Sequence, residues 1–184
     1  MEGWERHGVE LSEKHADSAK KQTFGESIFC GLIEDYPVTK ERFDVITFQD
    51  SFDHLVDPRY ILQKSHDLLK PEGLIVIKVH NISCLYAKLT GSKFYAILPP
   101  MHLFYFNETS LIQLLKRSRF RWIKSRFIGH MLALETVLFR LSSGNQYSIF
   151  FHLYKLVKGT KIGRIPVYKQ FNDIITIFAV KEAT

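Results

Sequence analysis

The fold is decided by the stretch from Phe43 to His80, which begins Phe43-Asp44-Val45-Ile46-Thr47-Phe48-Gln49. Residues 45–49 are β-branched and aromatic, as in a buried strand, and the polar loop 50–54 follows them. Asp57 can cap a helix that begins at Pro58, has Lys70 in its last turn and ends at Pro71. Residues 74–79 (Leu-Ile-Val-Ile-Lys-Val) hardly alternate, which favours a strand covered on both faces of a parallel sheet. This unit predicts a doubly wound α/β domain, in which ligands bind beyond the carboxyl ends of the strands.

The same residues resemble a known family. Phe43-Asp44-Val45-Ile46, Asp53-His54-Leu55, Asp57-Pro58 and Leu69-Lys70-Pro71-Glu72-Gly73 are similar to the signature of class I S-adenosylmethionine (SAM) dependent methyltransferases of the broad small-molecule group. Asp53 stands where that group usually has Glu, and Glu72 where it usually has Gly. The resemblance implies a Rossmann-like, doubly wound, mostly parallel sheet with an antiparallel final strand at residues 174–181. It also implies methyl transfer from SAM to a small-molecule acceptor, with oxygen as one candidate atom.

The resemblance also assigns cofactor residues. Residues 3–10 are expected to form a strand, and an acid at such a strand end holds ribose hydroxyls in nucleotide-binding folds. Residues 13–21 are expected to form a helix and residues 28–30 the next strand. The expected cofactor-binding residues are, at the ribose, Glu10 and Leu11; at the adenine, Leu32 and Ile33; and at the methionine end, Gln49, Asp50 and Ser51. An ordinary surface carboxylate at Glu10 and plain core residues at 32 and 33 are the alternatives.

Two histidines enter through the same resemblance. His102 lies in the segment 99–106, which the family places on the substrate side, and it is the candidate base for an acceptor hydroxyl. The alternative is a histidine that only packs beside Pro99 and Pro100. His54 is expected to hold its loop. Neither a nucleophile elbow nor a histidine spacing typical of metal sites is present, so no metal site is expected.

The glycine-rich turn that normally cradles SAM has no counterpart before Glu10. Three explanations remain open: a truncated start, a short form without cofactor, and completion of the sheet by another chain, as in a homo-oligomer. For this exact chain we expect weak or no SAM binding. We expect one methyltransferase-like domain over residues 1–184, lacking the first strand and glycine loop. Residues 128–172 would be a helical insertion on the substrate side, with helices at 130–141 and 149–157.

Charge and composition leave a rival interpretation. Residues 1–70 hold 9 Lys/Arg and 14 Asp/Glu, and the rest holds 16 and 5, so the second half is strongly basic. Basic and aromatic residues alternate between Lys116 and Arg126, which could bind nucleic acid or anionic membrane. The alternative function is therefore a non-catalytic interaction module with a basic face. Two cysteines without a disulfide pattern, no signal peptide and no long uncharged run favour a cytoplasmic protein.

Overall fold

The computed structural model describes residues 3–22, 27–37 and 43–182. At its centre, β3 (Phe43–Gln49) and β4 (Leu69–His80) pair in parallel, and the helix α2 (Pro58–Leu68) connects them along the chain. Asp57 caps this helix, because its Oδ1 accepts the backbone N–H groups of Arg59 and Tyr60, both at 3.0 Å. The predicted strand–helix–strand unit is therefore confirmed.

The end of α2 differs from the prediction. The helix stops at Leu68, and Lys70 belongs to β4 instead of the last helical turn. Lys70 precedes Pro71, and a residue before proline is pushed out of the helical region towards extended backbone. Leu69 is already extended and pairs with Phe43. Proline thus ends the helix earlier than its own position suggests.

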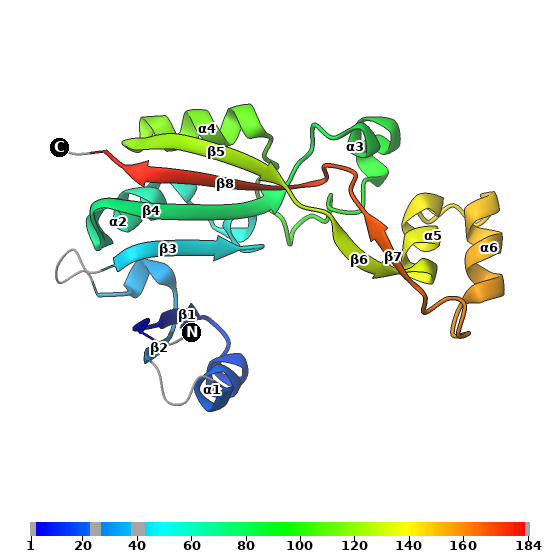
Figure 1. Cartoon of the computed structure of the whole chain (residues 1–184), viewed down its shortest axis with the longest axis horizontal. Helices are drawn as coiled ribbons and strands as arrows, with labels where there is room; N and C mark the ends of the chain where they lie inside the picture. The colour runs from blue at the N-terminus through cyan, green and yellow to red at the C-terminus, as the bar shows by residue number, and fades with distance from the viewer. Residues whose placement is uncertain (1–2, 23–26, 38–42, 183–184) are drawn as a thin grey trace.

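The four-stranded sheet has the order β3-β4-β8-β5. The last strand, β8 (Ile174–Lys181), runs antiparallel to both β4 and β5 (Phe120–Phe127), which confirms the antiparallel final strand. Helices α2 and α4 (Glu108–Arg117) contribute to the same core as the sheet (Figure 1). Most of its fully buried members come from β4, β8 and the two helices, among them Ile61, Leu62, Ile75, Ile77, Leu111, Leu115, Ile175 and Ile177.

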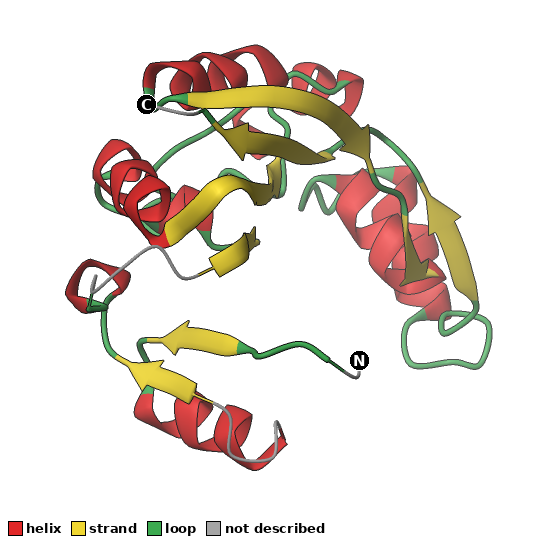
Figure 2. Ribbon diagram, turned by 60° about the vertical axis from the view of Figure 1, so that its left-hand side comes forward, coloured by secondary structure: helices red, strands yellow, loops and turns green. Residues whose placement is uncertain are grey.

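A separate unit lies at the N-terminus. Strands β1 (His7–Glu10) and β2 (Ser27–Cys30) pair in parallel and are connected through α1 (Glu13–Gln22). Residues 3–6, which we expected to be part of the first strand, lie outside β1 because its pairing with β2 begins at His7. Figure 2 shows this small sheet facing the β3 side of the larger one. Among the described residues no hydrogen-bonded strand joins the two sheets.

The segment before β8 forms an arm. An antiparallel ribbon of β6 (His130–Ala133) and β7 (Pro166–Lys169) leads to α5 (Leu134–Ser142) and α6 (Ile149–Val157), which lie at its far end (Figure 1). The prediction of a helix from residue 130 is wrong for the first four residues, because they pair with β7.

The short helix α3 (Leu85–Thr90) and the 3-10 turns η1 (Ile33–Asp35), η2 (Phe52–His54) and η3 (Gly91–Lys93) complete the elements.

A buried ion pair connects this arm to the sheet. The ammonium of Lys169 at the end of β7 donates to Asp173, just before β8, and both side chains are at most 3% exposed. The hydroxyl of Tyr95 donates to the same carboxylate. Burial alone would raise the pKa of Asp173, but the hydrogen bonds from Lys169 and Tyr95 outweigh it and hold that pKa below its usual value.

We predict that Asp173→Asn lowers the free energy of unfolding by about 3–5 kcal/mol at neutral pH, because it leaves the Lys169 charge buried without its partner. Urea unfolding measures this. Since the folded-state pKa of Asp173 is lowered, its contribution is present above the unfolded pKa of about 3.9 and is lost as pH falls through the folded value. The difference between parent and variant should therefore shrink in acid.

The matched control is Asp44→Asn. Asp44 forms a solvent-exposed pair with Lys70 at 2.9 Å, and such surface pairs contribute at most about 1 kcal/mol. Equal losses in the two variants would contradict the role given to the buried pair.

Candidate functional site

A cavity of about 600 Å³ lies between the N-terminal unit and the larger sheet. Its walls come from β1, the loop after β2, β3, the loop that follows β3, and α2. The carboxyl ends of parallel strands are where α/β proteins bind ligands, and a volume of this size suits a small molecule. Five of the seven expected cofactor residues line it: Glu10, Leu11, Leu32, Ile33 and Ser51.

Glu10 is held at the end of β1 by local hydrogen bonds. Its Oε1 accepts the backbone N–H of Ser12 at 2.9 Å, and its carbonyl accepts the N–H of Gly31 at 3.0 Å. The second bond ties the end of β1 to the loop that carries Leu32, whose side chain is 48% exposed. A partly buried carboxylate and an apolar wall therefore stand at neighbouring strand ends.

The other two expected cofactor residues do not line the cavity. Asp50 forms an ion pair with Lys78, and its N–H donates to the carbonyl of the same lysine at 3.1 Å. Gln49 is exposed at the end of β3. Their roles, like those of the five lining residues, stay predictions.

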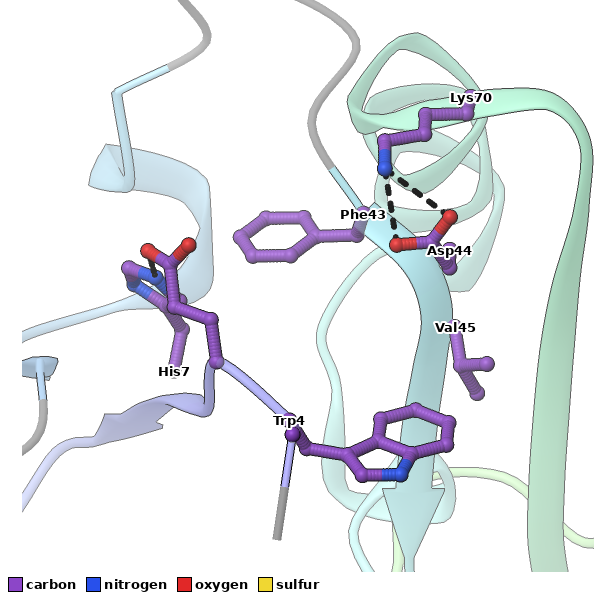
Figure 3. A pocket seen from close by; sticks show the side chains of 8 residues that line it. Trp4, His7, Phe43, Asp44, Val45 and Lys70 are labelled. Carbon is purple, nitrogen blue, oxygen red and sulfur yellow. Dashed lines mark hydrogen bonds and ion pairs between the residues drawn. The ribbon is translucent and has the colours of Figure 1, made fainter.

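A second cavity of about 340 Å³ continues along the same edge of β3. Figure 3 shows Trp4 and His7 on one side of it and Phe43 with the Asp44–Lys70 ion pair on the other. Within the described part of the chain, β3 pairs only with β4 and β1 only with β2. The two cavities therefore lie where the small sheet and β3 approach each other, and the described residues form no strand pairing across them.

Beyond the carboxyl ends of β3 and β4 lies a cluster around Asp53, which is 3% exposed. Its Oδ2 is 3.5 Å from Nδ1 of His80 and 4.0 Å from Nε2 of His102. His102 is 7% exposed, and its Nδ1 is hydrogen-bonded to the carbonyl of Ala96. Burial tends to raise the pKa of Asp53, but the His80 hydrogen bond and the nearby histidines lower it below its usual value.

His54 lies between this cluster and the larger cavity. Its side chain helps to line the cavity, and its ring centroid is 4.6 Å from that of His102. Its Nδ1 is 2.6 Å from the carbonyl of Met101, and the carbonyl of the preceding Asp53 accepts the N–H groups of Leu103 and Phe104. These bonds support the loop-holding role expected for His54.

The meeting of Asp53 with His80 was not predicted from the sequence. A signal was available. Asp53 follows shortly after the predicted strand at residues 45–49, and His80 directly follows its predicted parallel partner at residues 74–79. The carboxyl ends of such strands meet at one edge of the sheet, so polar residues at those ends are candidates for a common site.

Comparison with known proteins identifies the family. A family model described as a methyltransferase domain matches residues 2–125. The chain therefore belongs to the methyltransferase-domain family, as the sequence signature implied.

Individual relatives agree with this assignment. N-terminal Xaa-Pro-Lys N-methyltransferase 1 of Danio rerio is 34% identical over 77 residues, a match that covers 38% of this chain and about a third (34%) of that protein. A SAM-dependent methyltransferase of Thermotoga maritima superposes with a TM-score of 0.62 at 17% identity, covering 96% of this chain and 73% of that one. A SAM-dependent methyltransferase of Methanosarcina mazei gives 0.59 at 15% identity, covering 97% and 82%. These structures confirm the Rossmann-like fold.

Nothing in these comparisons favours the interaction-module alternative. Within the described ranges, the chain contains no helix of the length and apolar character that crossing a membrane requires.

We predict that the carboxyl of Asp53 titrates below the ordinary Asp pKa of about 3.9 and that His80→Gln raises its pKa, because the hydrogen bond from His80 is the largest stabilising influence on the carboxylate. A ¹³C NMR titration of the carboxyl carbons in the presence of a chelator measures both values. His152→Ala, on exposed α6, serves as the control and should leave the Asp53 titration unchanged. An unchanged pKa in His80→Gln would contradict this account of the cluster.

Proposed function

We propose that this domain binds SAM in the 600 Å³ cavity and transfers its methyl group to a small-molecule acceptor. The observation that carries the proposal is that five of the seven expected cofactor residues, including those expected at the ribose and the adenine, line that one cavity. Family membership supports the same activity. The sulfonium of SAM supplies an activated methyl group, so the protein's contribution is mainly to bind and orient the two reactants.

The residues lining the cavity fit part of the cofactor. Glu10 offers a carboxylate for ribose hydroxyls at the end of β1, and Leu32 and Ile33 offer an apolar wall for a purine. Ser51 is the lining residue from the segment expected at the methionine end. Gly8 and Gly31 line this cavity singly, and the described residues contain no glycine-rich turn beside it, so we expect the methionine portion to be held weakly.

The acceptor side is placed by the resemblance near residues 99–106 and the arm at residues 130–157. The role of His102 as a base stays a prediction. Its Nδ1 is engaged by Ala96 and its Nε2 faces Asp53, so direct proton transfer from an acceptor requires the ring to leave one of these neighbours. A cytoplasmic location is part of the same proposal.

Within the described residues, the strand pairing of β1 ends with β2 and that of β3 with β4, which supports a further part of the proposal, in which a second copy of the chain completes the sheet. Unpaired strand edges are templates for pairing with another chain. Completion would place additional backbone beside the cavity and strengthen cofactor binding.

We predict that S-adenosylhomocysteine binds the chain with a Kd well above about 1 μM, and that Glu10→Gln weakens binding by roughly 10-fold or more. The physical reason is that hydrogen bonds to a charged group contribute about 1.5–3 kcal/mol. A ¹H–¹⁵N NMR titration detects such weak binding and shows which amides respond. Gln can keep the acceptor oxygen that receives the Ser12 N–H, so the β1 end should remain folded.

Glu13→Gln, on exposed α1, is the matched control and should bind like the parent. An affinity that rises with protein concentration would support completion by a second copy. Equal affinities of the parent and Glu10→Gln, or shifts confined to residues away from β1 and β3, would overturn the proposed cofactor site.

A further inference from the structure

Three side chains from distant parts of the chain converge beside the proposed cofactor cavity. Asp53 comes from η2, His80 from the end of β4 and His102 from the loop before α4. Each offers one ligand atom, and these three atoms lie within 4.8 Å of one another. Both imidazoles approach the same carboxylate oxygen, Oδ2 of Asp53.

Hydrogen bonding fixes the form of the His102 ring. A carbonyl oxygen can only accept, so the contact with Ala96 requires a proton on Nδ1 of His102. In the neutral ring Nε2 then carries a lone pair, and this lone pair is directed towards a carboxylate. His54 repeats the arrangement, with Nδ1 on the Met101 carbonyl and Nε2 at 3.8 Å from Oδ1 of Asp53.

Protein donors satisfy the carboxylate only in part, because Nδ1 of His80 approaches Oδ2 at 3.5 Å and leaves Oδ1 to be accounted for. Among the residues that the structure describes, Oδ1 of Asp53 is buried without a hydrogen-bond partner. The 4.0 Å separation between Oδ2 and Nε2 of His102 is too long for a hydrogen bond. A buried charge of this kind is costly unless it is paired with a cation or coordinates a metal.

We propose that Asp53, His80 and His102 form a binding site for a divalent transition-metal cation, for which Zn²⁺ is the probe. Two imidazole nitrogens and one carboxylate oxygen are ligands that such ions prefer. Metal–ligand bonds of about 2.0–2.2 Å bring tetrahedral ligand atoms to roughly 3.4 Å from one another. The imidazole nitrogens lie 3.5 and 4.0 Å from the carboxylate oxygen and all three ligand atoms lie within 4.8 Å of one another, so side-chain rotations that draw the two rings together reach this geometry.

The supporting contacts are those of a metal centre. Ligating histidines usually donate their other ring N–H to a carbonyl or carboxylate, which fixes the tautomer, and His102 does this through Ala96. Three protein ligands leave a fourth position for water or for an oxygen of a bound molecule. The sequence predicted no metal site, because residues 53, 80 and 102 show no ligand spacing along the chain and meet only in the fold.

Metal binding can be tested without the proposed methyl transfer. We expect the full chain, freed of metal by chelation, to bind one Zn²⁺ in a calorimetric titration at neutral pH, and Co²⁺ to give the visible bands of a low-coordinate site. Asp53→Asn and His102→Asn should each weaken Zn²⁺ binding by at least roughly 10- to 100-fold, the loss caused even by changes outside the ligand shell. Asn at position 102 can still donate to the Ala96 carbonyl, which preserves the local fold.

The matched control is His152→Ala, which removes an exposed histidine on α6 and should leave the affinity unchanged. A second measurement needs no variant: histidine ¹⁵N NMR of the parent should show Zn²⁺ shifting Nε2 of His102 while its Nδ1 stays protonated. Absence of Zn²⁺ binding by the parent, unshifted His102 nitrogens, or equal affinities of parent and cluster variants would overturn the site. A protonated His102 at neutral pH would identify an imidazolium as the partner of Asp53 and would also overturn it.

The outcome is separable from that of the proposed function. Titration with S-adenosylhomocysteine reports on the cavity at Glu10, and titration with Zn²⁺ reports on Asp53. Either can fail while the other succeeds.

Discussion

The parallel pairing of β3 with β4 is the constraint on which the other features depend. Its register, from Val45 opposite Leu74 to Gln49 opposite Lys78, brings both carboxyl ends to one edge of the sheet. The loop with Asp53 leaves one of these ends and His80 terminates the other. Two residues 27 positions apart thereby meet across 3.5 Å. The other edge of β4 pairs with β8, and β8 in turn pairs with β5.

Much of this central unit could be predicted because its signals are local. Asp57 and Pro58 start α2 through a cap and a fixed φ angle, and both effects act within one helical turn. The apolar run of β4 likewise reflects burial on both faces. In contrast, residues 130–133 become a strand through pairing with Pro166–Lys169, more than thirty residues away. Nothing in their own composition distinguishes them from the helix that follows.

The candidate site divides in the same way. The positions of strand-end residues such as Glu10 and Ser51 beside the cavity could be predicted because a family resemblance supplies their register, and their roles stay predictions. The position of Asp50 could not, since its ion pair with Lys78 depends on how two strand ends lie beside each other. The Asp53 cluster combines three segments, and only the fold shows that His80 and His102 share one carboxylate oxygen.

The short turn η2 connects the two halves of the site. Ser51 and His54 line the cavity, whereas the carboxylate of Asp53 between them points into the buried cluster. The ring of His54 also contacts the ring of His102, so a residue of the cavity wall packs directly against a residue of the cluster. A change in charge or coordination at Asp53 therefore has a contiguous physical route to the cavity, through a turn whose backbone also holds Leu103 and Phe104. Because η2 is anchored on both sides, the cavity wall and the cluster can be expected to move together.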